Sequence, residues 1–118
     1  MPIAIGAVAV ILALIFFSQA GKSAIVGTWE ITEGSRVGKQ VTFMKNGSLY
    51  DNGGLEYFLN SYSLVSWEQI SGDTMILVDS HIYRTTYTFR YSIRGKTMTL
   101  TYDYGNGLLD SLTLKRIS

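Results

Sequence analysis

The chain has 118 residues, a formal net charge of +1 and no cysteine. This length is enough for one compact domain and a short additional segment. The near-neutral charge gives no indication of a nucleic-acid partner. The lack of cysteine excludes a disulfide-stapled scaffold and a thiolate metal site.

The N-terminal segment is apolar. Residues Pro2 to Gly21 carry no charge, and the first charged side chain is Lys22. Twenty residues in a helix span about 30 Å, which matches the hydrocarbon thickness of a bilayer. We therefore predict a long hydrophobic helix over residues 1–24, which serves as a filament core or as a single-pass membrane anchor. A cleaved secretory signal is disfavoured because no basic residue precedes the apolar run.

Small residues recur along one face of this predicted helix. Gly6, Ala13 and Ala20 follow one another at seven-residue spacing, and Ala9 lies four residues before Ala13. Small side chains on one face allow helices to approach closely in lipid or in another apolar core. The pattern predicts helix packing through Gly6, Ala9, Ala13 and Ala20, although alanine and glycine are common in any apolar helix.

The start of the chain resembles a known family. The uncharged sequence Met1-Pro2-Ile3-Ala4-Ile5-Gly6, followed by an unbroken apolar run, is similar to the mature N-terminus of archaeal type IV pilins. Bacterial type IV pilins carry a glutamate near this position, and here the neighbourhood is Ala4-Ile5-Gly6. The resemblance covers residues 1 to about 24. It implies that cleavage of a basic leader exposes Met1, that the helices bundle into a filament core, and that a β-rich domain coats it.

Residues 25–118 predict an antiparallel β domain. The first strand, Ile25–Thr32, places Trp29 and Ile31 on one face, and the segments from Thr85 to Arg94 and from Thr97 to Tyr104 alternate in the same way. Such alternation indicates strands with one buried and one wet face. Asn46-Gly47 predicts a tight hairpin turn. We expect seven or eight strands in a meander, and a helical turn or an extended excursion at Leu55–Tyr62.

Two further patterns bear on the fold. Ile70–Leu77 and Ile93–Leu100 share Ile, Gly, Thr, Met and Leu at an offset of 23 residues, which is typical of successive hairpins in an up-and-down sheet. The Gly27-Thr28-Trp29 pattern and Val41–Ser48 resemble the small lipocalin-like domains of prokaryotic surface proteins. The predicted class is α+β: a long apolar N-terminal helix followed by an antiparallel β-meander or small lipocalin-like β-barrel. A barrel this small is expected to be filled by side chains.

The sequence offers little for catalysis. The only histidine, His81, lies two residues after Asp79, and this pair is interpreted as a surface pair rather than a catalytic dyad. We expect no catalytic, cofactor-binding or metal-ligating residues. Asn46-Gly47-Ser48 makes Asn46 a candidate glycosylation site, unless the dipeptide serves the turn alone. The aromatic residues Tyr50, Tyr57, Phe58 and Tyr62 are expected to pack in the core or against a neighbouring subunit.

We therefore predict a structural subunit of an extracellular type IV pilus-like filament, without enzyme activity or cofactor. It would self-assemble through the N-terminal hydrophobic helix, with adhesion as a candidate role. Its partners would be copies of itself in a helical homopolymer, the membrane that holds the precursor, and a surface or host-cell ligand that the sequence does not identify. The alternative is a single-pass, membrane-anchored, lipocalin-like binding domain on the cell surface.

Overall fold

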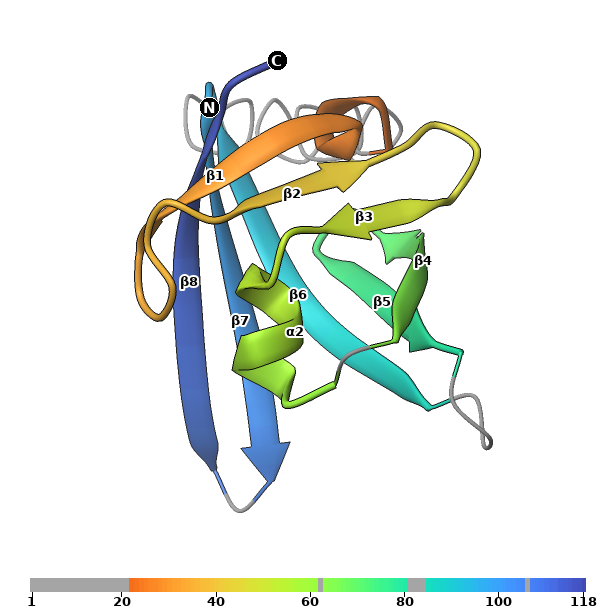
Figure 1. Cartoon of the computed structure of the whole chain (residues 1–118), viewed down its shortest axis with the longest axis vertical. Helices are drawn as coiled ribbons and strands as arrows, with labels where there is room; N and C mark the ends of the chain where they lie inside the picture. The colour runs from red at the N-terminus through yellow and green to blue at the C-terminus, as the bar shows by residue number, and fades with distance from the viewer. Residues whose placement is uncertain (1–21, 62, 81–84, 106) are drawn as a thin grey trace, which may run out of the picture.

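The computed structural model describes residues 22–61, 63–80, 85–105 and 107–118. The elements within these ranges are shown in Figure 1. The strands are β1 (Gly27–Glu33), β2 (Gln40–Phe43), β3 (Leu49–Asp51), β4 (Leu64–Ser71), β5 (Thr74–Asp79), β6 (Thr86–Arg94), β7 (Thr97–Gly105) and β8 (Leu108–Arg116), and the helix is α2 (Gly54–Leu59). The expected meander of seven or eight strands is confirmed, with eight strands in one sheet.

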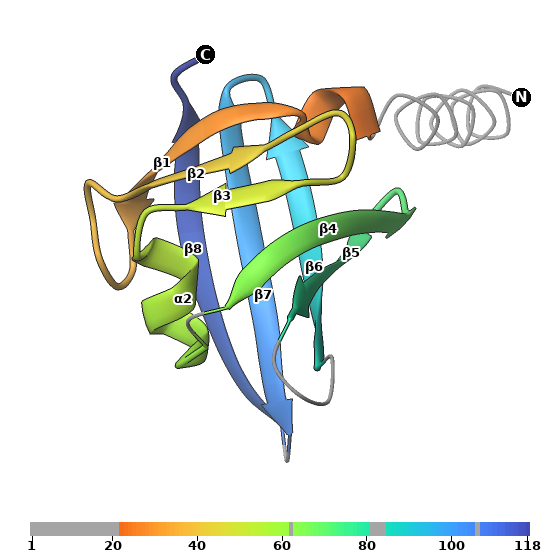
Figure 2. The same ribbon diagram turned by 45° about the vertical axis from the view of Figure 1, so that its right-hand side comes forward.

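The sheet curls into a nearly closed barrel. Its strand order is β3-β2-β1-β8-β7-β6-β5-β4, so the first strand of the chain pairs with the last. The two edge strands, β3 and β4, approach each other, as Figures 1 and 2 show. Ser48 and Ser66 form an isolated bridge there, and the backbone N–H of Trp67 donates to the carbonyl of Gly47 at 2.9 Å. The β-barrel part of the expected fold is therefore confirmed.

The predicted α+β class is wrong. The described part of the chain is mainly strand, and its helical residues are 22–25 and the short helix α2. No long apolar helix lies within the described ranges, and no helix there is long and apolar enough to cross a membrane. Residues 1–21 of the predicted helix lie outside the described residues. The error has a physical reason: among the described residues after residue 25 the helix is α2, whose six residues are too few to form a helical layer beside the sheet.

One hydrophobic core fills the concave face of the sheet. Trp29 and Ile31 are buried as predicted, and Phe89 of β6 and Leu100 of β7 belong to the same core cluster. The residues shared by Ile70–Leu77 and Ile93–Leu100 are explained by equivalent hairpins. In both β4–β5 and β6–β7, the chain turns back just before the shared Thr-Met pair. Met75 and Met98 are consequently both fully buried.

Helix α2 closes part of the open side of the barrel. Leu55 is fully buried and Phe58 is 9% exposed, so one helical face joins the core. The carboxylate of Asp51 accepts the backbone N–H groups of Leu55 and Glu56 at 3.0 and 2.8 Å. These bonds satisfy donors that a helix start leaves unpaired. Of the two expectations for Leu55–Tyr62, the helical turn is confirmed, one residue earlier than predicted.

Candidate functional site

The interior of the barrel is occupied by side chains. Trp29, Phe43 and Phe89 are completely buried, and they are among the largest of the core residues. The ring of Phe43 meets that of Trp67 edge-on, with centroids 5.4 Å apart, at the approach of β2 and β4. This packing agrees with the expectation for a small barrel. The surfaces that a ligand or partner could contact therefore lie at the two ends and on the outer face of the barrel.

At one end, Arg116 ties the end of β8 to the residues that lead into β1. Its guanidinium donates to the carbonyl of Val26 at 2.7 Å and to the carbonyl of Ala24. It also lies over the ring of Trp29, 4.4 Å from the centroid, and the Trp29 indole N–H donates to the carbonyl of Ile25 at 2.8 Å. A planar guanidinium with several donors can make both backbone hydrogen bonds and the ring contact at once.

Gly27 permits this close approach. Its φ of 137° belongs to a backbone region that favours glycine, and an added Cβ would overlap the Arg116 guanidinium. The Gly27-Thr28-Trp29 pattern thus has a local physical cause: glycine makes room for the arginine, and tryptophan stacks beneath it. We name this group of side chains and backbone, formed by Ala24, Val26, Gly27, Trp29 and Arg116, the junction.

A hollow of about 300 Å³ lies beside the junction. Lys22, Ser23, Val26 and Lys45 line it, and we name it the basic hollow. Both lysines are exposed, and Lys45 is in the β2–β3 turn. The neighbouring Met44 is 45% exposed. The hollow therefore combines two positive charges with apolar surface.

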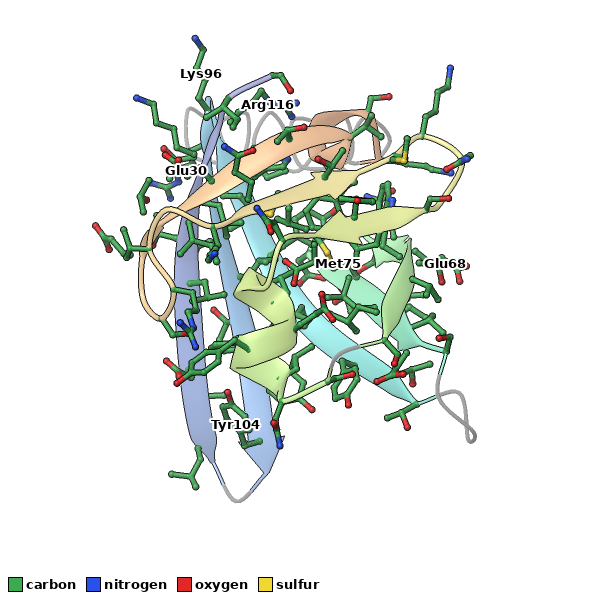
Figure 3. All side chains as sticks on the ribbon, in the orientation of Figure 1. Glu30, Glu68, Met75, Lys96, Tyr104 and Arg116 are labelled. Carbon is green, nitrogen blue, oxygen red and sulfur yellow. The ribbon has the colours of Figure 1, made fainter. Side chains whose placement is uncertain are left out.

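The opposite end of the barrel carries an apolar hairpin tip. Figure 3 shows Tyr104 at the far end of the barrel from Arg116 and Lys96. Near the β7–β8 turn, Tyr104 is 50% exposed, Leu108 66% and Leu109 65%. Asp103 and Asp110 flank them and are also exposed. We name Asp103, Tyr104, Leu108, Leu109 and Asp110 the hairpin tip.

An aromatic cluster supports the hairpin tip from the concave side. The ring of Tyr102 lies 5.1 Å from that of Phe89 and meets the ring of Tyr104 edge-on at 4.8 Å, measured between centroids. Phe58 of α2 lies 6.0 Å from Tyr104 by the same measure, and the Tyr104 hydroxyl donates to the Phe58 carbonyl at 3.4 Å. Burial raises the pKa values of the Tyr102 and Tyr104 hydroxyls. The cluster holds α2 against β6 and β7.

A wider hollow of about 700 Å³ lies on the outer face of β6, β7 and β8. It is lined by Thr86, Thr88, Arg90, Thr101, Tyr102, Asp103, Gly105 and Leu109. Thr86, Thr88 and Arg90 are among the exposed positions of β6, which alternate with buried and half-buried residues. This surface has hydroxyl groups and one charge of each sign, and so offers hydrogen bonds to a polar ligand.

Acidic side chains gather near α2. Asp79 is 6% exposed and accepts a hydrogen bond from the Ser61 hydroxyl. Burial raises the pKa of Asp51 and of Glu56, and the negative charges of Asp51 and Asp79 add to the effect on Glu56. The expected surface pair of Asp79 with His81 needs correction, because Asp79 is buried on the inner face of β5; His81 lies outside the described residues. Among the described residues, no three His, Cys, Asp or Glu side chains are grouped so that they could hold a metal ion.

The predicted site residues divide into two groups. Gly6, Ala9, Ala13 and Ala20 lie outside the described residues, so their packing stays a prediction. Asn46 is exposed on the β2–β3 turn, and its side-chain carbonyl accepts the Ser48 N–H at 2.9 Å. This bond and the Gly47 φ of 91° confirm the turn, and glycosylation stays a prediction.

The predicted aromatic group is not one cluster. Phe58 is in the core, whereas Tyr50 is 74% exposed and Tyr57 is 48% exposed beneath the guanidinium of Arg36. Tyr62 lies outside the described residues. Sequence reasoning missed the junction and the hairpin tip. The adjacent Leu108 and Leu109, which put an apolar residue on both faces of a strand end, could have indicated the tip.

Comparison with known proteins gives no family for this chain. No protein-family model matches it, and no curated protein matches its sequence.

Proposed function

We propose that the protein is a structural subunit of an extracellular filament of the type IV pilus kind, without enzyme activity. The apolar N-terminal segment would form the filament core, and the barrel would form the outer wall. The observation that carries this proposal is the junction. A run of twenty uncharged residues leads directly into a barrel whose last strand holds the connecting backbone through Arg116.

The filled barrel supports a structural role. Core side chains occupy the concave face of the sheet, so the domain offers its surface rather than a ligand chamber. The junction supports load transfer, because a charge-assisted hydrogen bond is stronger than a neutral one. A subunit that is pulled through its N-terminal segment would therefore pass force into β8 and β1 together.

The finer parts of the proposal rest on the sequence. Similarity to archaeal type IV pilins and to lipocalin-like surface domains favours a cell-surface location, with a membrane-inserted precursor before assembly. Self-association would use the small-residue face of Gly6, Ala9, Ala13 and Ala20. Adhesion would be a property of the exposed barrel surface.

Sedimentation followed by electron microscopy tests this function. The purified full-length chain, after removal of detergent, should pellet as large assemblies that appear as regular thin filaments. A chain that stays monodisperse only in detergent, and that gives amorphous aggregate without it, would contradict the filament proposal.

A second candidate function is a membrane-anchored binding domain. The outer hollow of about 700 Å³ favours it, because its threonines and Arg90 are suited to a polar ligand. In that case the chain would reconstitute into lipid vesicles as a monomer. Arg90→Ala would then reduce ligand binding without affecting the state of association.

A further inference from the structure

The two ends of the barrel are complementary in charge and both expose apolar side chains. We propose that the hairpin tip of one copy docks in the basic hollow of a second copy. This inference deepens the proposed filament function, because it names a contact between neighbouring barrels.

The hairpin tip has the properties of a contact surface. Leu108 and Leu109 are both about two-thirds exposed, and Tyr104 adds a half-exposed ring. Leu108 and Leu109 are consecutive residues of β8 and lie on opposite faces of the hairpin end, so the tip is apolar on both sides. Such a concentration of exposed apolar surface marks an interaction site more often than an isolated apolar residue does. The carboxylates of Asp103 and Asp110 lie on either side and give the tip two negative charges.

The basic hollow offers the matching surface. Lys22 and Lys45 supply two positive charges, and Val26 forms an apolar part of the lining. One end of the molecule thus carries acidic and apolar groups, and the other end carries basic and apolar groups. When two copies meet, their complementary electrostatic potentials favour tip-to-hollow contact over tip-to-tip contact.

The contact must join different molecules. Strand β8 begins at Leu108 in the hairpin tip and ends at Arg116, whose guanidinium contacts Ala24 and Val26 beside the hollow. A strand of this length covers about 30 Å, and Figures 1 and 2 show the β7–β8 turn at the far end from the β8 terminus. Because different surfaces meet, the contact is head-to-tail, and repeated head-to-tail contacts build open arrays wherever the rotation between neighbours does not close a ring.

An anionic membrane surface is a less suitable partner for the tip. Its two carboxylates would be repelled by acidic headgroups, and moving them into lipid is costly. The lysines of the hollow alone would attract such a surface, but this leaves Leu108 and Leu109 without a partner. A second copy of the chain satisfies both ends.

Cysteine crosslinking of the whole 118-residue chain tests this contact, because its sequence has no cysteine. Ser23→Cys is placed in the hollow and Leu108→Cys in the tip, each in a separate chain of distinguishable mass. The two chains are mixed in equal amounts, oxidised mildly in detergent and again after its removal, and separated on a non-reducing gel. A disulfide requires the two Cα atoms within about 7 Å, so mixed dimers report docking of tip on hollow.

We expect the mixed disulfide to exceed its statistical share under at least one of the two conditions. Val65→Cys on β4, at a position 46% exposed, replaces Ser23→Cys in the control and should give only the statistical product. Equal yields with Ser23→Cys and Val65→Cys, or an excess of tip-to-tip dimers, would overturn the proposal.

Charge reversal provides a second readout. Lys45→Glu in the Ser23→Cys chain should lower the mixed yield roughly two- to fivefold, as expected for one exposed charge pair. Asp110→Lys in the Leu108→Cys chain should restore it, and a further loss would overturn the proposal. Filaments without the mixed disulfide would refute only this contact, whereas the mixed disulfide without filaments would refute only the filament function.

Discussion

Replacement of Arg116 by methionine should loosen the junction without disturbing the rest of the barrel. Methionine keeps most of the apolar stem but has no donors and no charge. The change removes the hydrogen bonds to the carbonyls of Val26 and Ala24 and the cation–π contact with Trp29. The residues that lead into β1 would then be held mainly by Ile25 in the core and by the pairing of β1 with its neighbours.

The expected cost follows from these contacts. A hydrogen bond to a charged donor contributes about 1.5–3 kcal/mol and an exposed cation–π contact about 0.5–1 kcal/mol. Because Arg116 is only partly buried, solvent screening reduces these values, and we expect a loss of about 2–4 kcal/mol in the free energy of unfolding. At about 4–8 °C per kcal/mol, the unfolding midpoint should fall by at least roughly 8 °C.

Urea and thermal unfolding of residues 22–118, followed by tryptophan fluorescence, measure this loss. Arg94→Met is the matched control, since Arg94 is exposed at the end of β6, and it should change stability by less than about 0.5 kcal/mol. Equal effects of the two substitutions would refute the view that Arg116 holds the junction.

Three further predictions concern the barrel, its helix and the N-terminal segment. Residues 22–118 alone should give a β-type circular dichroism spectrum and a cooperative thermal transition, because the core is contained within them; an aggregated product would show that the fold needs what precedes it. Asp51→Asn removes a carboxylate whose folded-state pKa is raised above 3.8, mainly by burial. The folded state therefore binds this proton more tightly than the unfolded state. The unfolding free energy of the wild type relative to Asp51→Asn should fall as pH rises from below 3.8 through the raised pKa, and a rise over that window in paired urea titrations would contradict the assignment. Ala13→Leu should abolish or thin the filaments seen by electron microscopy, since overpacking costs about 1–3 kcal/mol at each repeat, while Leu14→Ile should be tolerated; equal yields would exclude this face as the packing surface.

Local patterns predicted most of the sheet. Alternation in β6 and β7 correctly divided buried from exposed positions, because a strand turns successive side chains to opposite faces. Asn46-Gly47 correctly placed the β2–β3 turn, where Gly47 takes the positive φ and the Asn46 side chain accepts the Ser48 N–H. The repeated Gly-x-Thr-Met pattern correctly indicated two equivalent hairpins.

Long-range contacts were not predictable in this way. The pairing of β1 with β8 joins Glu30 to Lys115 across most of the chain, and no short pattern encodes it. The junction depends on that pairing, because it brings Arg116 onto Trp29. Asp79 was interpreted as half of a surface pair with His81, but the alternation of β5 turns its side chain inward. The α+β class was wrong because the predicted helix of residues 1–24 was counted as a second layer of the fold. The described part of the chain is instead a barrel with the short helix α2.

Cryo-electron microscopy of detergent-free material would show how the subunits are arranged. We expect helical filaments in which barrels form the outer wall and the N-terminal segments lie at the centre. Within them, the β7–β8 turn of one subunit should lie beside Lys22 and Lys45 of the next. Particles that contain single barrels bound to lipid or detergent, with no repeating contact between copies, would contradict this expectation.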